Sequence, residues 1–130
     1  MSHPQPVYIP RESADWQYKD EPGRARYRYR LLIDASGGPT AGLIHGIAEF
    51  PADGGFEAAH RHNLPQTSHV LSGSGRAWIG QREFRARAGD TFFIPAGTMH
   101  GWQAGDEALV LFWSYPADRF DQITYDFQDT

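Results

Sequence analysis

Short runs of alternating apolar and polar residues recur along the chain, and residues that favour turns separate them. Between Tyr27 and Ile33, aromatic and aliphatic side chains alternate with arginines, which is the period-two pattern of a strand with one buried face. Comparable apolar or alternating segments cover residues 27–33, 42–50, 67–71, 76–79, 82–87, 91–94 and 109–114. Many short strands separated by Gly- and Pro-containing turns are typical of sandwiches and barrels. The sequence therefore predicts an all-β fold.

The two ends of the chain depart from this pattern. Residues 1–26 are rich in proline and mix aromatic with charged residues. This composition indicates an extended arm that lies over the barrel or a partner subunit, or else a partly ordered tail. The last dozen residues are the best candidate for a helix, although they are polar. We therefore expect an N-terminal arm over residues 1–26, a barrel over 27–116 and a C-terminal tail over 117–130.

Composition narrows the class of protein. The 130 residues are 40% hydrophobic and 14% aromatic, which suffices for one buried core. A net charge of −4, with 12 basic residues spread among 16 acidic ones, argues against a nucleic-acid partner. The absence of cysteine excludes a disulfide scaffold, a thiolate nucleophile and a Cys-ligated metal. No secretory signal pattern and no apolar run of about 18 residues is present, so we expect a cytoplasmic protein without a membrane partner.

Histidines carry the strongest chemical signal. His60 and His62 are two positions apart, so on a strand both side chains point to the same face. A turn at residues 63–65 would fold the chain back and aim Gln66 at the same space, and His100 follows a rigid Pro-containing turn. Three imidazoles and one amide oxygen that converge inside a barrel would form a site for a divalent first-row metal. Taken alone, a His-x-His pair is also compatible with ordinary surface or core histidines.

A longer pattern resembles the two signature motifs of the cupin superfamily. Residues 54–73 read G-x5-H-x-H-x3-Q-x6-G, and residues 89–100 read G-x5-P-x-G-x2-H. The resemblance covers roughly residues 42–114 and implies a double-stranded β-helix (jelly-roll) barrel with a metal in its interior. It also implies that one divalent ion, of iron, manganese, nickel or zinc, is held at the four ligand positions His60, His62, Gln66 and His100.

The sequence departs from the cupin motifs at two positions. Gln66 stands where the first motif has Glu, and Ala104 stands where the second motif ends in Asn. An amide ligand leaves the site more positive than a carboxylate does, which gives a stronger Lewis acid that attracts an anionic substrate. The alternative is that Gln66 marks a site that no longer holds metal. Gln also occupies this position in small cupins that act on unsaturated uronates, but with a spacing one residue longer, so that substrate is not inferred.

Side-chain alternation selects candidates for the pocket wall. Ser68 has the parity of Gln66, and Trp102 has the parity of the third histidine, so both are expected to line the pocket. His45 lies on a mixed face that is either pocket or solvent, and it is a candidate acid or base. His69 lies three residues after Gln66 and is expected to point outward.

These features leave three functional hypotheses. The first is Lewis-acid catalysis by an isomerase or lyase on a small anionic or enolisable substrate, with a proton moved by a side chain that the sequence does not identify. The second is an iron-dependent dioxygenase, and the third is a small-molecule binding module without catalysis. The barrel that the resemblance implies has open sheet edges that need to be covered. A homodimer, in which the N-terminal arm covers part of these edges, is therefore also predicted.

Overall fold

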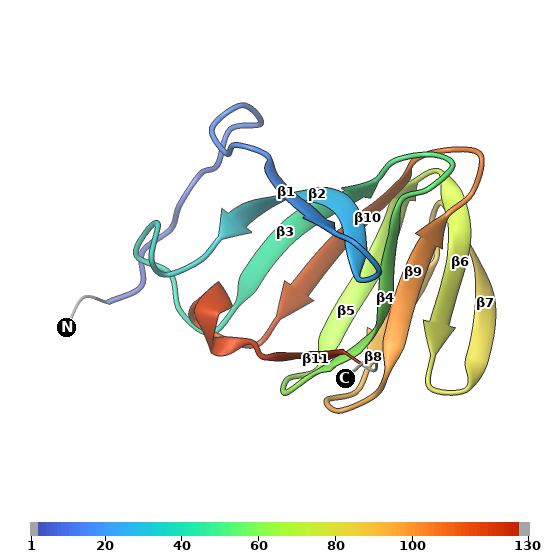
Figure 1. Cartoon of the computed structure of the whole chain (residues 1–130). Helices are drawn as coiled ribbons and strands as arrows, with labels where there is room; N and C mark the ends of the chain where they lie inside the picture. The colour runs from blue at the N-terminus through green and yellow to red at the C-terminus, as the bar shows by residue number, and fades with distance from the viewer. Residues whose placement is uncertain (1–2, 128–130) are drawn as a thin grey trace.

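The computed structural model describes residues 3–127, shown as a ribbon in Figure 1. Within this range the chain forms one sheet of eleven strands, and every strand pair is antiparallel. The strands are β1 Gln17–Glu21, β2 Ala25–Ile33, β3 Ile44–Phe50, β4 Phe56–His62, β5 Gln66–Ser72, β6 Ser74–Ile79, β7 Arg82–Arg87, β8 Thr91–Ile94, β9 His100–Ala104, β10 Leu109–Tyr115 and β11 Tyr125–Phe127. The remaining regular element is a short 3-10 helix, η1 Phe120–Gln122. The all-β prediction is confirmed.

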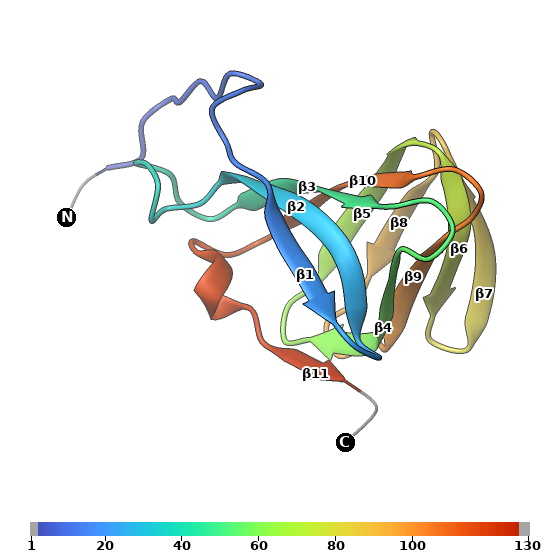
Figure 2. The same ribbon diagram turned by 45° about the horizontal axis from the view of Figure 1, so that its top comes forward.

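The sheet curls into a half-barrel with the strand order β7-β6-β9-β4-β2-β3-β10-β5-β8. Strand β2 makes the continuous curl possible, because its first residues pair with β4 and its later residues pair with β3. Strand β1 pairs with β2, and β11 pairs with β4. Figures 1 and 2 show β11 beside β4 at one end of the barrel, and the N-terminal arm on the side away from β6 and β7.

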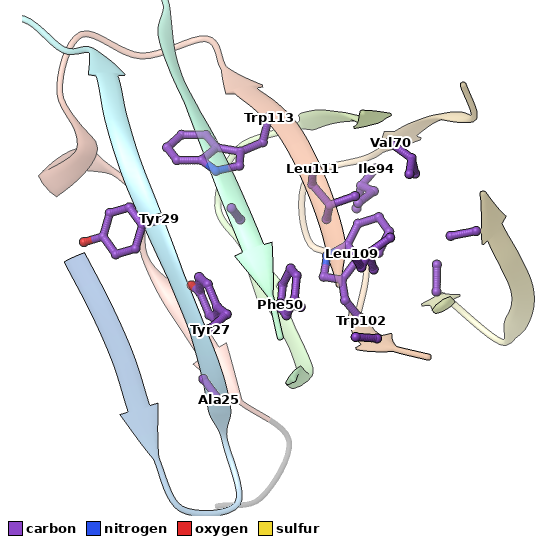
Figure 3. Packing of buried hydrophobic residues seen from close by; sticks show 14 of the residues in the cluster. Ala25, Tyr27, Tyr29, Phe50, Val70, Ile94, Trp102, Leu109, Leu111 and Trp113 are labelled. Atoms are coloured by element: carbon purple, nitrogen blue, oxygen red, sulfur yellow. The ribbon is translucent and has the colours of Figure 1, made fainter. Parts of the chain in front are cut away.

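Alternation along the strands builds the core as the sequence pattern predicts. Tyr27 and Tyr29 of β2 are buried while the arginines that alternate with them, Arg26, Arg28 and Arg30, are not, because successive residues face opposite sides of a strand. Phe50 of β3 lies 4.8 Å from Tyr27, measured between ring centroids. Figure 3 shows Tyr27, Phe50, Leu109 and Trp102 gathered in the interior that the strands enclose. The interior is therefore rich in aromatic side chains, which matters for the site described below.

Every alternating segment predicted from the sequence overlaps a strand, whereas β1, β4, β9 and β11 were not among the predicted segments. The helix expected in the last dozen residues is wrong over the part that the structure describes. There the chain forms η1 and then extends into β11. Asp126 of β11 pairs with Arg61 of β4, with 2.7 Å between Nη2 and Oδ2. Strand pairing of the polar segment with β4 therefore outweighs its weak preference for a helix.

The predicted return of the chain after His62 takes another route. Strand β5 does not pair with β4 but with β10 and β8, so residues 63–65 carry the chain across the barrel. The curl of the sheet gives two layers, one of β7, β6, β9 and β4 and the other of β3, β10, β5 and β8, with β2 between them. Gln66 of β5 then enters the interior from the layer opposite to β4. This crossing has a direct consequence for the site, because it places groups from both layers around one point.

Candidate metal centre

Three histidines from two neighbouring strands meet inside the barrel. His60 and His62 lie on β4, His100 begins β9, and His60 is paired directly with His100 in the sheet. All three side chains are buried, and one nitrogen from each lies within 4.8 Å of the others. This is the only such group of potential metal-binding side chains within residues 3–127.

Backbone carbonyl groups orient the three rings. The Nδ1 atom of His60 lies 2.6 Å from the carbonyl oxygen of Ala58, and the Nδ1 atom of His100 lies 2.9 Å from that of Thr98. The Nδ1 atom of His62 faces a third carbonyl oxygen, at 3.3 Å. A carbonyl oxygen only accepts, so each ring carries its proton on Nδ1 and presents the Nε2 lone pair to the centre. Rings held in this way are the usual arrangement around a metal.

The charge state of the histidines also suits a metal. Burial lowers the pKa of His60 to about 4, and burial together with the neighbouring ring lowers the pKa of His100 to about 4. Burial and both neighbouring rings lower the pKa of His62 to about 3. At neutral pH all three are neutral, as metal binding requires. The Nε2 atom of His100 has no hydrogen-bond partner among the described residues, although it is buried. The three residues therefore fit a divalent cation.

Gln66 lies next to this cluster, linked to it through a tyrosine. Its amide oxygen accepts a hydrogen bond from the hydroxyl group of Tyr115 at 2.9 Å, and the same hydroxyl lies 3.0 Å from Nε2 of His62. The amide nitrogen donates to Ser68 at 2.8 Å, which fixes the oxygen toward the cluster. Two oxygen atoms, from Gln66 and Tyr115, thus stand beside the three nitrogens.

Glu57 completes the surroundings of the histidines. Its Oε2 atom lies 3.6 Å from Nε2 of His60 and accepts a hydrogen bond from the Tyr27 hydroxyl at 3.2 Å. Glu57 and His60 are three positions apart, so a regular strand would point them to opposite faces. The pairing of β4 with β9 shifts by one residue between them, and this β-bulge turns both side chains inward. Burial raises the pKa of Glu57 to about 7.

A cavity adjoins the cluster on the side of β2, β3 and β10. The centres of water molecules could occupy about 30 Å³ of this cavity, so it has room for a few waters. Its walls combine apolar rings with polar groups from strands across the barrel and from the C-terminal segment. The lining residues are Tyr27, Tyr29, Ala48, Phe50, Glu57, Gln66, Trp102, Leu111, Trp113, Tyr115, Phe120 and Tyr125. Burial raises the pKa of Tyr115 and of Tyr125 well above the ordinary value, so both hydroxyl groups keep their protons.

The structure brings most, but not all, of the candidate pocket residues to this site. Trp102 lines the cavity, and Ser68 is fully buried behind Gln66. His45 is not brought to the site, because alternation along β3 turns it outward, where its ring packs on Phe112 at 3.8 Å between centroids. His69 also points outward, and its Nδ1 lies 2.7 Å from the Thr91 hydroxyl.

The sequence did not single out Glu57, Tyr115 or Tyr125. Tyr115 shares the parity of the buried Trp113, so alternation along β10 could have identified it. No local pattern identifies Glu57, because the bulge depends on pairing with β9. Tyr125 reaches the site only because β11 pairs with β4, opposite His62.

Comparison with known proteins agrees with this architecture. The sequence matches the cupin domain family over residues 46–115, and it matches no curated protein. Among solved structures, KdgF from Halomonas sp. is 25% identical and superposes with a TM-score of 0.72 over 91% of this chain and 99% of its own. The polyketide cyclase RemF from Streptomyces resistomycificus is 22% identical, with a TM-score of 0.79 over 97% of this chain and 87% of its own.

A third solved structure shows how widely the fold is used. Salicylate 1,2-dioxygenase from Pseudoaminobacter salicylatoxidans is 17% identical, with a TM-score of 0.71 over 88% of this chain and 31% of its own. The described residues contain no helix with the length and hydropathy needed to cross a bilayer. The family match spans more than half of the chain and includes both histidine motifs, so this protein belongs to the cupin superfamily and has its jelly-roll fold.

Proposed function

We propose that this cupin binds one divalent first-row metal ion and acts on a small anionic or enolisable organic molecule as an isomerase or lyase. His60, His62 and His100 would hold the ion, with the amide oxygen of Gln66 as a neutral fourth donor. The observation that carries the proposal is the convergence of three neutral imidazole rings, each held in one tautomer by a backbone carbonyl group. Nitrogen and oxygen donors of this kind suit zinc, nickel, manganese and ferrous iron.

The groups around the histidines favour catalysis by proton transfer over oxygen chemistry or ligand binding without catalysis. A bound divalent ion supplies Lewis acidity, which polarises a carbonyl or carboxylate oxygen of the substrate. Tyr115 and Tyr125 stay protonated because they are buried, so their hydroxyl groups can donate hydrogen bonds to an oxygen on which negative charge develops. The Tyr115 hydroxyl lies 3.0 Å from Nε2 of His62, and it would turn from the Gln66 amide oxygen to donate to a substrate oxygen.

The cavity limits the size and nature of the substrate. Its walls are largely aromatic, and Gln66, Glu57 and the tyrosine hydroxyls are the polar groups that it presents. A molecule of a few heavy atoms fits such a space without rearrangement of the barrel, whereas a long chain does not. Similar folds occur in a polyketide cyclase and a salicylate dioxygenase, so the fold does not select the reaction. The groups around the cluster therefore carry the argument.

Metal analysis of protein purified without chelator, combined with an oxygen-uptake assay, tests this proposal. Zinc, nickel or manganese in about equimolar amount, with no oxygen requirement for turnover, supports the isomerase or lyase. Iron together with oxygen consumption on a diketone or a phenol contradicts it and indicates a dioxygenase. Protein that binds a small organic ligand but never retains metal also contradicts it and indicates a binding module.

We also propose that the protein is a homodimer. The N-terminal arm exposes the apolar side chains Val7, Tyr8 and Ile9, and its contact with the barrel includes a hydrogen bond from the Gln5 N–H to the Pro39 carbonyl oxygen. The ring of Trp16 anchors the end of the arm, with the guanidinium group of Arg28 at 3.9 Å from its centroid. An anchored arm with exposed apolar residues is suited to pack on a second subunit.

A further inference from the structure

Two hydrogen-bond acceptors face each other in the metal centre. The Nδ1 proton of His60 is directed to the Ala58 carbonyl oxygen, so the Nε2 atom of the neutral ring carries a lone pair. That lone pair faces the Oε2 atom of Glu57 at 3.6 Å. A nitrogen lone pair opposite a carboxylate oxygen is unfavourable unless positive charge lies between them. The geometry therefore calls for a shared cation or a proton at this point.

We propose that Glu57 is itself a ligand of the metal and supplies the anionic oxygen that the centre lacks because position 66 is Gln. This inference rests on the proposed function, since it assigns a further ligand to the same site. Two donors that each lie about 2.1 Å from one ion are at most about 4.2 Å apart. The 3.6 Å between Oε2 of Glu57 and Nε2 of His60 is within this limit, so these two atoms can share an ion. The group whose ligand atoms all lie within 4.8 Å of one another is His60, His62 and His100, so His60 is the histidine that would link Glu57 to the centre.

The rest of the fold holds Glu57 in this position. The β-bulge at residues 58–59 turns the side chain inward, and the N–H of Ala58 is bonded to the Arg24 carbonyl oxygen at 2.8 Å. The hydroxyl of Tyr27 donates to the same carboxylate oxygen that faces His60. Glu57 is buried, with 8% of its surface exposed. A buried carboxylate with one neutral donor is incompletely compensated, and a metal ion completes the compensation.

A ligand at this position alters the charge of the centre. With Gln66 alone as oxygen donor the centre keeps the full charge of the ion, whereas the carboxylate of Glu57 lowers it by one unit. The chain would thus have moved its carboxylate ligand from β5 to β4, across the barrel. Both layers then contribute oxygen ligands to the metal. Glu57 lies beside His60, and Gln66 is linked to His62 through the Tyr115 hydroxyl.

The test compares Glu57→Gln with Glu49→Gln, using Zn²⁺ and Co²⁺ as probes. Glu49 is a half-exposed carboxylate on β3 that pairs with Arg28 outside the cavity, so its variant controls for loss of one negative charge. Competition with a chromogenic chelator should show Zn²⁺ binding weakened about 10-fold to 100-fold in Glu57→Gln and unchanged in Glu49→Gln. The visible absorption bands of bound Co²⁺ should shift in the first variant only. Unchanged affinity together with an unchanged Co²⁺ spectrum in Glu57→Gln would overturn the inference.

Thermal unfolding gives a second, independent readout. Without metal, Glu57→Gln should be as stable as the parent protein or more stable, because a poorly compensated buried charge is removed. Its gain in Tm on addition of Zn²⁺ should be smaller than that of the parent. A purely structural carboxylate predicts the reverse, with a lower Tm without metal and an unchanged gain.

A further variant keeps the inference testable if Glu57→Gln does not fold. Glu57→Asp retains the charge but withdraws the oxygen by one methylene group, so it should weaken Zn²⁺ binding and shift the Co²⁺ bands as well. Wild-type binding in both respects would overturn the inference. The His60→Ala variant separates the two proposals. If His60→Ala binds Zn²⁺ like the parent protein, the assignment of the metal centre is wrong. If His60→Ala loses Zn²⁺ binding but the Glu57 variants keep it, only the role of Glu57 is refuted.

Discussion

The carbonyl oxygen of Ala58 lies 2.6 Å from the Nδ1 atom of His60, two residues further along the same strand. Ala58 lies where the pairing of β4 with β9 shifts by one residue. The shift turns this carbonyl group toward the His60 ring and so directs its Nε2 atom to the centre. It also brings Glu57 to the inner face. One irregularity in the sheet thus positions two chemical groups of the site.

Removal of a histidine of the cluster should abolish tight metal binding. His60→Ala and His100→Ala each remove one of three converging nitrogens, so we expect at least a 100-fold loss of Zn²⁺ affinity in chelator competition. His69→Ala is the matched control, because His69 lies on the outer side of β5 and should leave binding unchanged. Full metal occupancy of both cluster variants under chelator challenge would show that the ion binds elsewhere or not at all.

Replacement of Gln66 by Glu should tighten metal binding and weaken the binding of anions. A carboxylate is a stronger donor than an amide, and the Ser68 hydroxyl, which now accepts from the amide, can turn and donate to it. The added negative charge repels an anion in a buried site. Zn²⁺ affinity and the effect of malonate on the Co²⁺ spectrum measure the two effects separately. Gln103→Glu is the control, because it makes the same charge change at an exposed position of β9 and should alter neither the Zn²⁺ affinity nor the malonate effect. If the two variants behave identically, Gln66 is not part of the metal centre.

Asp34 should stabilise the fold at neutral pH but not in acid. Its carboxylate accepts hydrogen bonds from the Ser36 hydroxyl and backbone N–H and from the N–H of Phe120, at 2.6 Å, which ties the end of β2 to η1. Burial opposes ionisation, but the hydrogen bonds from Ser36 and Phe120 prevail and lower the pKa of Asp34. Its contribution is therefore complete above the unfolded value of about 3.9 and is lost as the pH falls through the lower folded value.

Urea unfolding of Asp34→Asn measures this contribution. We expect a loss of about 1–3 kcal/mol near pH 7, because an amide NH₂ group would face one of the N–H donors. The difference from the parent protein should shrink toward zero at pH values below the folded pKa. A difference that persists unchanged in acid would mean that the stabilisation does not depend on the charge of Asp34.

Gly46 should be intolerant of a side chain, because it leaves room for a residue of the cavity wall. A Cβ atom there would overlap the indole ring of Trp113 and lie 2.5 Å from the Arg30 carbonyl oxygen. Gly46→Ala should cost about 1–3 kcal/mol of stability and shift the tryptophan fluorescence. At Gly37 a Cβ atom would approach only the Asp34 carbonyl oxygen, at 3.8 Å, so Gly37→Ala is the matched control. Equal stability of the two variants would contradict the packing described for Trp113.

The homodimer can be tested through the N-terminal arm. Light scattering at micromolar concentration should give about twice the 14.6 kDa of one chain. Deletion of residues 1–15 spares β1 and Trp16 but removes the exposed side chains of Val7, Tyr8 and Ile9, so it should shift the protein toward the monomer. A monomer that persists at high concentration in the full-length protein would refute the proposal.

Local sequence pattern was sufficient for seven of the eleven strands and for the ligand face that His60 and His62 share. The alternation in β2 and β10, and the two-residue spacing of His60 and His62, need no distant information, because side chains on a strand alternate wherever it lies. The cupin motifs added His100, and the fold and family that they implied are both confirmed.

Only the tertiary structure decided which polar groups accompany the histidines. Gln66 arrives from the opposite layer because β5 pairs with β10 and not with β4. Tyr125 arrives because β11 pairs with β4, although its segment is polar and lacks a strand pattern. Glu57 turns inward because the pairing of β4 with β9 contains one extra residue. Strand pairing is set by partners far away in the sequence, and a shift of one residue exchanges the two faces of a strand, so local alternation does not predict these positions.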